Sequence, residues 1–518
     1  MLPAPLTSGA LRIALEKKLG LSLLDSKLVL APESDRYCAT LSMKCQQSPF
    51  ELGQPFDLEI DIGDCSQISA NVTPDNTFIR MTTLYDGTQG NKYANQAEAV
   101  DFIVVPGLSS HAFGSFKSPR DATENWLRDY LPTTLPNIRV LVYGYDSHLL
   151  THEGKESIVD HAKGLLDSIR SHRQDPQTAH RPFIFLGHSL GGLVIKQALT
   201  TLSCEIGRNK QDEQLFKACY GLLFFGVPNL GLRHEELLGA VIGKMPSENL
   251  IRDLIVTKES EPSAFLTALS ESFVTCCKLQ EFKVVAFYET LNSNTLEQNP
   301  DGRWARSGPK KLMVTKASAT WIHGQANSRK EIPLSTDHSG LVKFTGRSDP
   351  QYTDSVKFHI EEMVKAAPST INERFSRMHG LSSDQRAVLD SLRLDPVHEI
   401  RDGKIDDPCA DTLKWFFIDS RFQSWRDSPE APCFWVYGPP GQGKSVLAKS
   451  LTSHLEKYAR TRPAENIAVL SFFCYGQGEQ SRRPTDILRS LIIQLIDCKE
   501  LFDYLPERYR QDPATFRG

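Results

Sequence analysis

The sequence lacks several features that mark membrane, secreted or nucleic-acid-binding proteins. No apolar run approaches the roughly 20 residues of a membrane span, and residues 1–6 lack the basic and then apolar layout of a secretory signal. Its 59 basic and 63 acidic residues leave a net charge of −4, which disfavours nucleic acid or an anionic membrane as the main partner. We therefore expect a cytoplasmic protein with no transmembrane segment and no nucleic-acid partner.

Paired cysteines are also lacking. The 11 cysteines of the chain are scattered and form no C-x-x-C pair, so the sequence predicts neither a disulfide framework nor a cysteine metal site. With 518 residues, of which 40% are hydrophobic and 24% charged, the chain has an ordinary globular composition and enough length for about two to four domains.

The most informative stretch is an apolar run at 183–186 that leads into Gly-His-Ser-Leu-Gly at 187–191. Apolar residues then recur at helical spacing over 193–199. A strand, a sharp G-x-S-x-G turn and a helix are the setting of a nucleophile elbow. The turn would hold the Ser189 hydroxyl at the N-terminus of a helix, where the helix dipole favours a developing negative charge.

From residue 99 the sequence alternates between strand-like and helix-like segments, which favours an α/β fold with a mostly parallel sheet. We expect the last strand at 312–315 and a closing helix at 352–366. The other predicted strands are 101–105, 139–145, 183–186, 221–227 and 282–288, and the other predicted helices lie around 126–130 and at 158–169.

Ser189, Glu289 and His338 each follow a predicted strand, and ligands bind beyond the carboxyl ends of strands in such sheets. Their chain order, nucleophile, acid and then histidine, is the order of α/β-hydrolases. His338 would take the Ser189 proton, and Glu289 would orient the histidine ring. The oxyanion hole would use the N–H of Leu190 and an N–H of the Gly107-Leu108 loop.

Other residues compete for some of these roles. Asp146 or Asp253 could supply the acid in place of Glu289. Asp337 is interpreted as a loop cap, and His188 as packing beside the nucleophile. A working site also needs Ser189 Oγ within about 3.2 Å of a His338 ring nitrogen, or slightly farther without substrate.

Residues 101–352 resemble the serine-hydrolase domain of the lipase and GPI inositol-deacylase-like group, in the version found at the N-terminus of fungal NLR-like proteins. In that resemblance, Ser189, Glu289 and His338 fall on the triad positions. Pro106 departs from the pattern, because lipases of this group often carry a histidine there. The resemblance rests on the segments 107–117, 126–129, 143–146, 187–191, 225–229, 287–290 and 337–339.

A second motif lies near the C-terminus. Residues 434–437 are strand-like, and Gly-Pro-Pro-Gly-Gln-Gly-Lys-Ser at 438–445 is a complete G-x-x-x-x-G-K-S P-loop before a helical pattern. Its expected cofactor is ATP or GTP with Mg²⁺, and the Ser445 hydroxyl would ligate the metal only when nucleotide binds. The residues predicted to bind nucleotide are Gly438, Gly441, Gly443, Lys444 and Ser445.

The partner of that motif is missing. A P-loop ATPase needs an acidic residue at the end of a second strand, but no carboxylate ends the predicted strand 467–474. Asp497 falls in the helical pattern that begins at 484. These residues resemble the first half of a NACHT domain, so we expect weak nucleotide binding or none, and no independent ATP hydrolysis.

The sequence thus predicts a serine hydrolase that cleaves an ester or lipid-type substrate through an acyl-Ser189 intermediate and needs no cofactor for that reaction. The resemblance implies a role in fungal immune or incompatibility signalling, with homo-oligomers or NLR-type signalling partners. The alternative is a non-catalytic scaffold with a P-loop nucleotide switch. The predicted parts are a small α+β module at 1–95, the α/β-hydrolase domain at 96–366, a helical linker at 367–430 and a truncated NACHT segment at 431–518.

Overall fold

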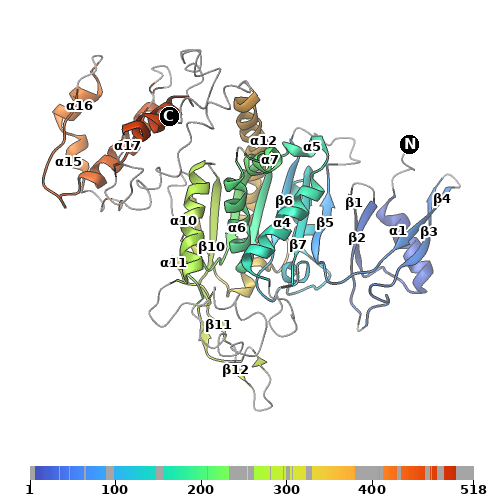
Figure 1. Cartoon of the computed structure of the whole chain (residues 1–518). Coiled ribbons are helices and arrows are strands. Elements are labelled where there is room, and N and C mark those ends of the chain that lie inside the picture. Colours follow the sequence, from blue (N-terminus) through green and yellow to red (C-terminus); the bar gives the residue numbers. More distant parts are fainter. Residues whose placement is uncertain are drawn as a thin grey trace. The chain divides into compact units, whose positions relative to one another are not determined.

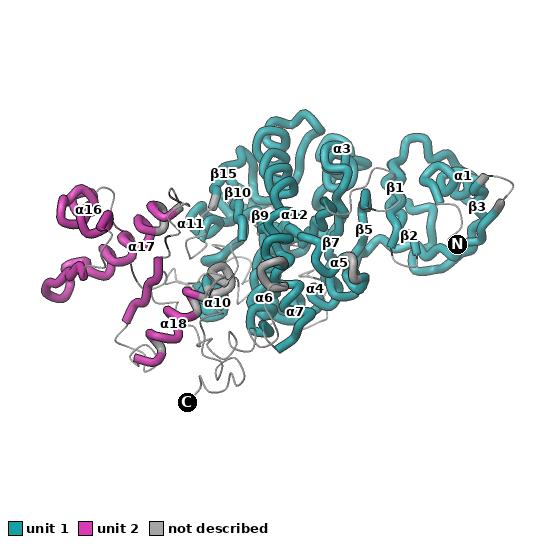
Figure 2. The backbone as a smooth tube through the Cα atoms, turned by 90° about the horizontal axis from the view of Figure 1, so that it is seen from above, with its two compact units in different colours: residues 1–322, 326–376 teal, residues 323–325, 377–518 magenta. Residues whose placement is uncertain are grey.

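A computed structural model of the chain divides into two compact units, residues 1–322 with 326–376, and residues 323–325 with 377–518 (Figure 2). Each unit is described by itself. The residues that the structure describes are 6–33, 36–45, 47–63, 66–88, 98–146, 156–206, 208–232, 254, 262–279, 282–295, 297–298, 304–305, 307–321, 329–379, 405, 408, 412–428, 433–460, 462, 467, 469–474 and 484–496.

The first unit is built around a seven-stranded sheet with the order β15-β10-β9-β8-β6-β7-β5 (Figure 1). Only β5 is antiparallel to its neighbour, and the other pairs are parallel. This order, with an antiparallel strand at one edge, is that of the α/β-hydrolase fold. The strands are β5 (Arg80–Asp86), β6 (Val100–Val105), β7 (Ile138–Gly144), β8 (Phe183–His188), β9 (Cys219–Phe225), β10 (Lys283–Glu289) and β15 (Arg329–Leu334).

The central strands are buried along their whole length because helices cover both faces of the sheet. Helices α4 (Ile158–His172), α6 (Leu190–Cys204) and α10 (Ala264–Leu279) lie on one face, and α12 (Phe358–His379) on the other (Figure 1). Shorter elements of the unit are η2 (Gly114–Phe116), α2 (Trp126–Asp129), α3 (Leu131–Thr134), α5 (Pro176–Ala179), α7 (Lys210–Ala218), α11 (Lys316–Ala319), η3 (Ser339–Val342), β11 (Ser293–Asn294), β12 (Glu297–Gln298), β13 (Trp304–Ala305) and β14 (Lys310–Lys311).

The predicted last strand is wrong. Residues 312–315 form no strand, and the sheet ends instead with β15, whose sequence is Arg-Lys-Glu-Ile-Pro-Leu. An edge strand pairs on one side only, so it tolerates charged residues and Pro333, and it lacks the apolar run of a central strand. The apolar character of 312–315 has another cause, because Val314 is buried against the core as part of a loop.

The closing helix is longer than predicted. A π-helical segment, η4 (Gln351–Lys357), continues directly into α12, which ends at His379 rather than near residue 366. Pro368 lies inside α12 and is tolerated there. Its ring removes one helical N–H, but the helix face on either side stays packed, with Ile360, Ala367 and Ile371 fully buried.

The N-terminal part of this unit is a small α+β arrangement, as the sequence indicates. Helix α1 (Ser8–Leu19) packs against two antiparallel hairpins, β1 (Lys27–Glu33) with β2 (Arg36–Ser42), and β3 (Phe56–Gly63) with β4 (Ser66–Val72). Polar contacts join it to the hydrolase-fold part, including an Arg128 guanidinium that donates to Ser42 Oγ at 3.1 Å. Strand β5, which follows this module, belongs to the large sheet.

The second unit contains four described helices and a small aromatic core that includes Phe416 and Phe422. The predicted strands at 434–437 and 467–474 are not formed by the residues described there, which pair with no neighbouring strand. An isolated strand leaves its backbone N–H and C=O groups unpaired, and Trp435 and Tyr437 are correspondingly exposed. The helices are α15 (Lys414–Phe417), α16 (Ser420–Arg426), α17 (Lys444–Arg460) and α18 (Pro484–Ile496).

None of the helices in the described residues is both long enough and apolar enough to cross a bilayer. Residues 380–404, which belong to the predicted helical linker, and Asp497 lie outside the described residues.

Candidate active site

Ser189 stands between the end of β8 and the first residue of α6, as the elbow motif predicts. Its backbone has φ 50° and ψ −124°, a strained conformation for a residue with a side chain. The strain is held in place because the Ser189 N–H donates to the Phe225 carbonyl of β9 at 2.8 Å. The side chain therefore stands at the N-terminus of a buried helix, where a developing negative charge is stabilised.

The turn is possible only because the neighbouring elements approach very closely. A Cβ at Gly191 would lie 2.3 Å from the carbonyl oxygen of Val105 and 2.4 Å from that of Pro106. These atoms belong to the end of β6 and the loop after it, so the first turn of α6 is locked against that loop. The Tyr145 hydroxyl donates to the Pro106 carbonyl at 2.8 Å, and burial raises the pKa of this phenol, which keeps it a donor.

Glu289 and His338 are brought together across 49 residues of sequence. The Glu289 Oε2 atom lies 2.6 Å from His338 Nδ1, and the carboxylate side chain is fully buried. Glu289 is the last residue of β10, and His338 follows the adjacent strand β15, so both side chains lie beyond the same edge of the sheet. A proton on Nδ1 is shared with the carboxylate in this contact, which leaves Nε2 as the ring nitrogen available for proton transfer.

The structure reveals supporting residues that sequence reasoning missed. The Val314 N–H donates to Glu289 Oε1 at 2.9 Å, and the His338 N–H donates to Ser293 Oγ at 3.2 Å. Gly226, at φ 55°, passes so near His338 that a Cβ there would lie 3.0 Å from the ring. In the sequence, only the glycine after a buried strand could have indicated one of these residues. Val314 and Ser293 reach Glu289 and His338 only through tertiary folding, so no local pattern marks them.

No hydrogen bond joins Ser189 to His338 in the described part of the chain, so the predicted contact between the hydroxyl and the ring is not made in this structure. They are connected through β9, because the Ser189 N–H bonds to Phe225, and the next residue, Gly226, lies against the His338 ring. His188 Nε2 also lies 3.1 Å from the His338 carbonyl oxygen. Catalytic hydrogen bonds are often long in the absence of substrate.

The predicted oxyanion donors also lie around Ser189. Leu190 is the first residue of α6, and N–H groups in the first helical turn have no acceptor within the helix. The Gly107 backbone is adjacent, because a Cβ there would lie 3.0 Å from Ser189 Cβ. Leu108 packs against the main core. Leu190 and Gly107 thus lie beside Ser189, and the function of Leu190, Gly107 and Leu108 as donors stays a prediction.

The competing residues take other positions. Asp146 is exposed after β7, which β6 separates from β8, and Asp253 lies outside the described residues. Asp337 accepts from the Gly340 N–H at 2.8 Å, which is a loop-capping contact. His188 is buried beside the His338 ring, with the ring centroids 5.2 Å apart.

The P-loop residues form a glycine loop that opens helix α17. Gly441 and Gly443 have φ values of 81° and 72°, which favour glycine. The Lys444 ammonium donates to the carbonyls of Gly438 and Pro439, both at 2.7 Å, while Ser445 is exposed. A glycine loop at a helix N-terminus is a common setting for phosphate groups, and the role of Ser445 as a Mg²⁺ ligand stays a prediction. Nucleotide binding stays a prediction.

Comparison with known proteins gives separate matches for the two parts of the chain. The family model "Nephrocystin 3, N-terminal" matches residues 411–517. The chain is 30% identical over 217 residues to Protein SERAC1 of Danio rerio, which covers 38% of this chain and 31% of that protein. It is 29% identical over 140 residues to the vegetative incompatibility protein HET-E-1 of Podospora anserina, which covers 26% of this chain and 9% of that protein.

The chain thus spans less than a third of the length of these relatives. Among solved structures, a lipase-esterase related protein from Clostridium acetobutylicum is 10% identical with a TM-score of 0.29, over 55% of this chain and 99% of that one. Phospholipase PlaB from Legionella pneumophila is 14% identical with a TM-score of 0.33, over 53% of this chain and 61% of that one. Likenesses this distant carry no argument about activity.

The chain joins an α/β-hydrolase fold to a NACHT-like segment.

Proposed function

We propose that this chain is a serine hydrolase that cleaves an ester or lipid-type acyl bond. The observation that carries the proposal is the buried hydrogen bond between Glu289 and His338 beside a serine held at φ 50°. Burying a carboxylate costs free energy unless it is hydrogen-bonded or paired with a charge. The side-chain partner of the Glu289 carboxylate is the His338 ring, which it orients. Strain of the Ser189 kind is concentrated at functional sites.

In the proposed reaction, Ser189 Oγ attacks the acyl carbon while His338 Nε2 takes its proton. The negative oxygen of the tetrahedral intermediate accepts hydrogen bonds from the amides of Leu190 and of Gly107 or Leu108. His338 then gives the proton to the leaving alcohol, and the acyl group remains on Ser189. A water molecule then gives a proton to His338 and attacks the acyl carbon of the acyl-enzyme. The carboxylic acid is released, and His338 returns the proton to Ser189. Glu289 stays ionised and stabilises the imidazolium that forms twice in this cycle.

The comparisons support the proposal only for part of the chain. The α/β-hydrolase order of the sheet and the position of the elbow favour a hydrolase over other uses of an α/β domain. The match to an incompatibility protein and the NACHT-like segment suggest that the hydrolase acts within a signalling protein, in cytoplasm, with NLR-type partners or a second copy of the chain. Weak nucleotide binding at Lys444 belongs to the same proposal.

A fluorophosphonate probe tests the activity directly, because it reacts only with an activated serine. We expect the wild-type chain to be labelled, and Ser189→Ala to lose labelling while its unfolding temperature stays close to the wild-type value. Ser203→Ala, a change of another serine on the same helix α6, is the matched control and should label normally.

Labelling that survives Ser189→Ala would refute the assignment of the nucleophile. Absence of labelling in the wild-type chain, together with no turnover of a panel of esters, would instead favour the scaffold alternative with a nucleotide switch.

A further inference from the structure

A cavity that Ser189 does not line lies within the first unit, between the N-terminal module and the loop that follows β6. Its volume is about 520 Å³, inside the roughly 300–1,000 Å³ range of small-molecule sites. Most of its lining is apolar. The apolar lining residues include Leu15, Leu28, Leu41, Met43, Phe50, Val72, Phe78 and Phe113.

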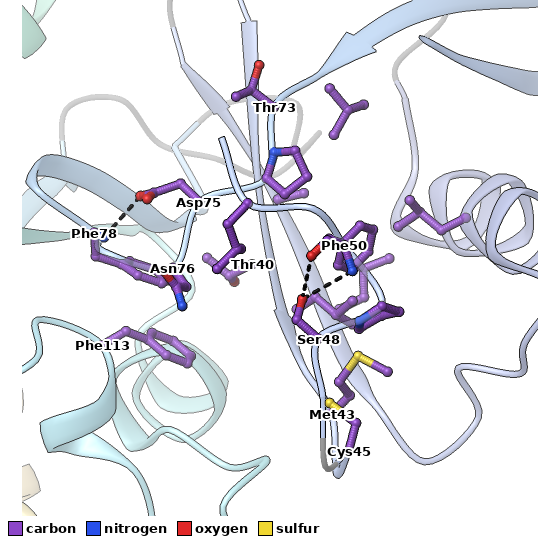
Figure 3. Close-up of a pocket in the computed structure, with 18 of the residues that line it drawn as sticks. Thr40, Met43, Cys45, Ser48, Phe50, Thr73, Asp75, Asn76, Phe78 and Phe113 are labelled. Carbon is purple, nitrogen blue, oxygen red and sulfur yellow. Dashed lines mark hydrogen bonds between the residues drawn. The ribbon is translucent and has the colours of Figure 1, made fainter. Parts of the chain in front are cut away.

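The polar side chains in this lining differ in whether they have hydrogen-bond partners. Thr40 is 3% exposed, and its Oγ1 atom has no hydrogen-bond partner among the described residues. This oxygen is enclosed by the protein, so it does not face the space of the cavity. In Figure 3, Thr40 lies between Phe78 and Phe113 on one side and Phe50 and Met43 on the other.

Lys117 is the cation in the lining, and it forms no ion pair within the described part of the chain. Its ammonium lies over the Phe113 ring, 5.3 Å from the ring centre. Burial and the neighbouring charge of Arg128 lower the pKa of Lys117. Both causes destabilise an ammonium that has no counter-ion, and a bound anion would relieve them.

The lining contains five further polar side chains, those of Ser48, Thr73, Asp75, Asn76 and His111. His111 Nδ1 accepts the N–H groups of Phe113 and Gly114, while its Nε2 faces the Asn76 carbonyl at 2.7 Å, so this ring is neutral. The one acid in the lining, Asp75, accepts three hydrogen bonds from Thr77 and Phe78. Burial alone would raise the pKa of the Asp75 carboxyl, but these hydrogen bonds lower it, so Asp75 stays ionised with its oxygens occupied. Lys117 is the charged lining group that has no ion-pair partner among the described residues.

One wall of the cavity is also held under strain. Phe78 has φ 52°, which is unusual for an aromatic residue. Its carbonyl would collide with any side chain at residue 144, since a Cβ at Gly144 would lie 1.8 Å from that oxygen. The Phe78 ring stacks on Phe113 with the centroids 5.1 Å apart. A strained aromatic wall that is fixed by its neighbours is a feature of ligand clamps.

We propose that this cavity is a binding site for a long-chain carboxylate, distinct from the hydrolase site. The aliphatic chain lies among the leucines and Phe50 of the N-terminal module. The carboxylate faces Lys117. The proposal does not depend on the activity of Ser189.

The observations favour this ligand class over others. A neutral apolar molecule would leave the Lys117 ammonium without an anionic partner, and a cationic amphiphile would be repelled by it. A nucleotide or sugar would bury many polar groups against leucines and phenylalanines at a cost of desolvation. A single aliphatic chain with one anionic end matches both the apolar lining and the ammonium of Lys117.

Wild-type protein provides a test that needs no substitution. Cys45 lines the cavity and is exposed, and Cys204 on α6 is exposed elsewhere. We expect saturating palmitate to slow alkylation of Cys45 and to leave Cys204 unchanged, as measured by peptide mass spectrometry. Hexadecyltrimethylammonium should not protect Cys45. An unchanged alkylation rate of Cys45 at saturating palmitate refutes the site.

Substitutions then test separately the contacts to the carboxylate and to the aliphatic part of the ligand. Displacement of a fluorescent fatty acid measures binding. Lys117→Met should weaken palmitate binding about tenfold, the size of one charge-assisted contact, whereas Lys44→Met should not. Lys44 is the matched control, because its charge is nearby and mostly exposed and it does not line the cavity.

Leu41→Trp should abolish binding by filling the cavity, and the exposed Leu24→Trp on the same module should not. Ser189→Ala should bind palmitate normally. Equal binding by Leu41→Trp, or lost binding in Ser189→Ala, would show that the ligand occupies another place. Absence of fluorophosphonate labelling would leave the palmitate result untouched, so the two proposals fail separately.

Discussion

Glu289 accepts one hydrogen bond on each carboxylate oxygen, from Val314 and from His338. The two contacts have different consequences. The Val314 amide fixes the side chain in place, while the second oxygen selects the tautomer of the histidine. A residue that acts in this way positions the base and does not touch the substrate.

Glu289→Gln separates these roles. The glutamine can keep the contact to Val314 but offers an N–H or a neutral oxygen to His338, which favours the wrong tautomer and no longer stabilises the imidazolium. We expect kcat/KM for an ester to fall by about 10³- to 10⁴-fold, with little change in unfolding temperature. Glu362→Gln, at an exposed carboxylate paired with Lys330, is the control and should retain full activity. A loss of less than tenfold would point to another acid.

At the scale of elements, the site depends on how closely the first turn of α6 meets the loop after β6. That contact is backbone to backbone, so neither partner can move aside by changing a rotamer. It places the serine, the Leu190 amide and the Gly107 loop in one small region.

Gly191→Ala tests this contact. The added methyl would lie 2.3 Å from the Val105 oxygen, far inside van der Waals distance, so strand and helix must separate. We expect a destabilisation of about 2–4 kcal/mol and loss of fluorophosphonate labelling. Gly346→Ala is the matched control, because a Cβ there meets nothing within 4 Å, and chemical denaturation should show a change of at most about 0.5 kcal/mol. A stable and fully labelled Gly191→Ala protein would contradict this account.

At the scale of the whole first unit, stability depends on one acid at the opposite end of the sheet. Asp101 is fully buried and meets three guanidinium groups, those of Arg139 at 2.7 Å, Arg173 at 2.5 Å and Arg181 at 3.3 Å. Burial alone would raise the pKa of Asp101, but the three charges outweigh it and hold the pKa well below its usual range. The cluster joins β6 and β7 to the segments that flank α4 and β8.

Asp101→Asn should therefore lower the free energy of unfolding by about 3–5 kcal/mol, because it leaves buried cations without their counter-ion. The folded pKa of Asp101 is depressed, so its stabilisation is present above the unfolded pKa of about 3.9 and is lost as the pH falls through the folded value. The difference between wild type and Asp101→Asn should accordingly shrink below about pH 4. Asp167→Asn, at an exposed ion pair on α4, should change stability by less than about 1 kcal/mol. Urea titrations at several pH values measure each difference, and a constant gap down to low pH would contradict the argument.

The local sequence was sufficient to predict the central strands, the elbow and the candidate residues that follow the ends of strands. Apolar runs and glycines report burial and tight turns directly, and these are properties of neighbours along the chain. Ser189, Glu289 and His338 could be named because a parallel sheet brings strand ends to one edge. The edge strand β15 could not be predicted, because a strand that pairs on one side only need not be apolar. The strand before the P-loop was predicted from its apolar residues alone, but a strand also requires a neighbouring strand to pair with.

Tertiary structure decided what distant residues do to one another. Only the folded chain brings Val314 and Ser293 to the Glu289–His338 pair, and sets Asp101 among three arginines. It also encloses a cavity between the N-terminal module and the loop after β6. Such contacts join residues far apart in sequence through packing, and packing is a property of the whole chain that no local pattern encodes.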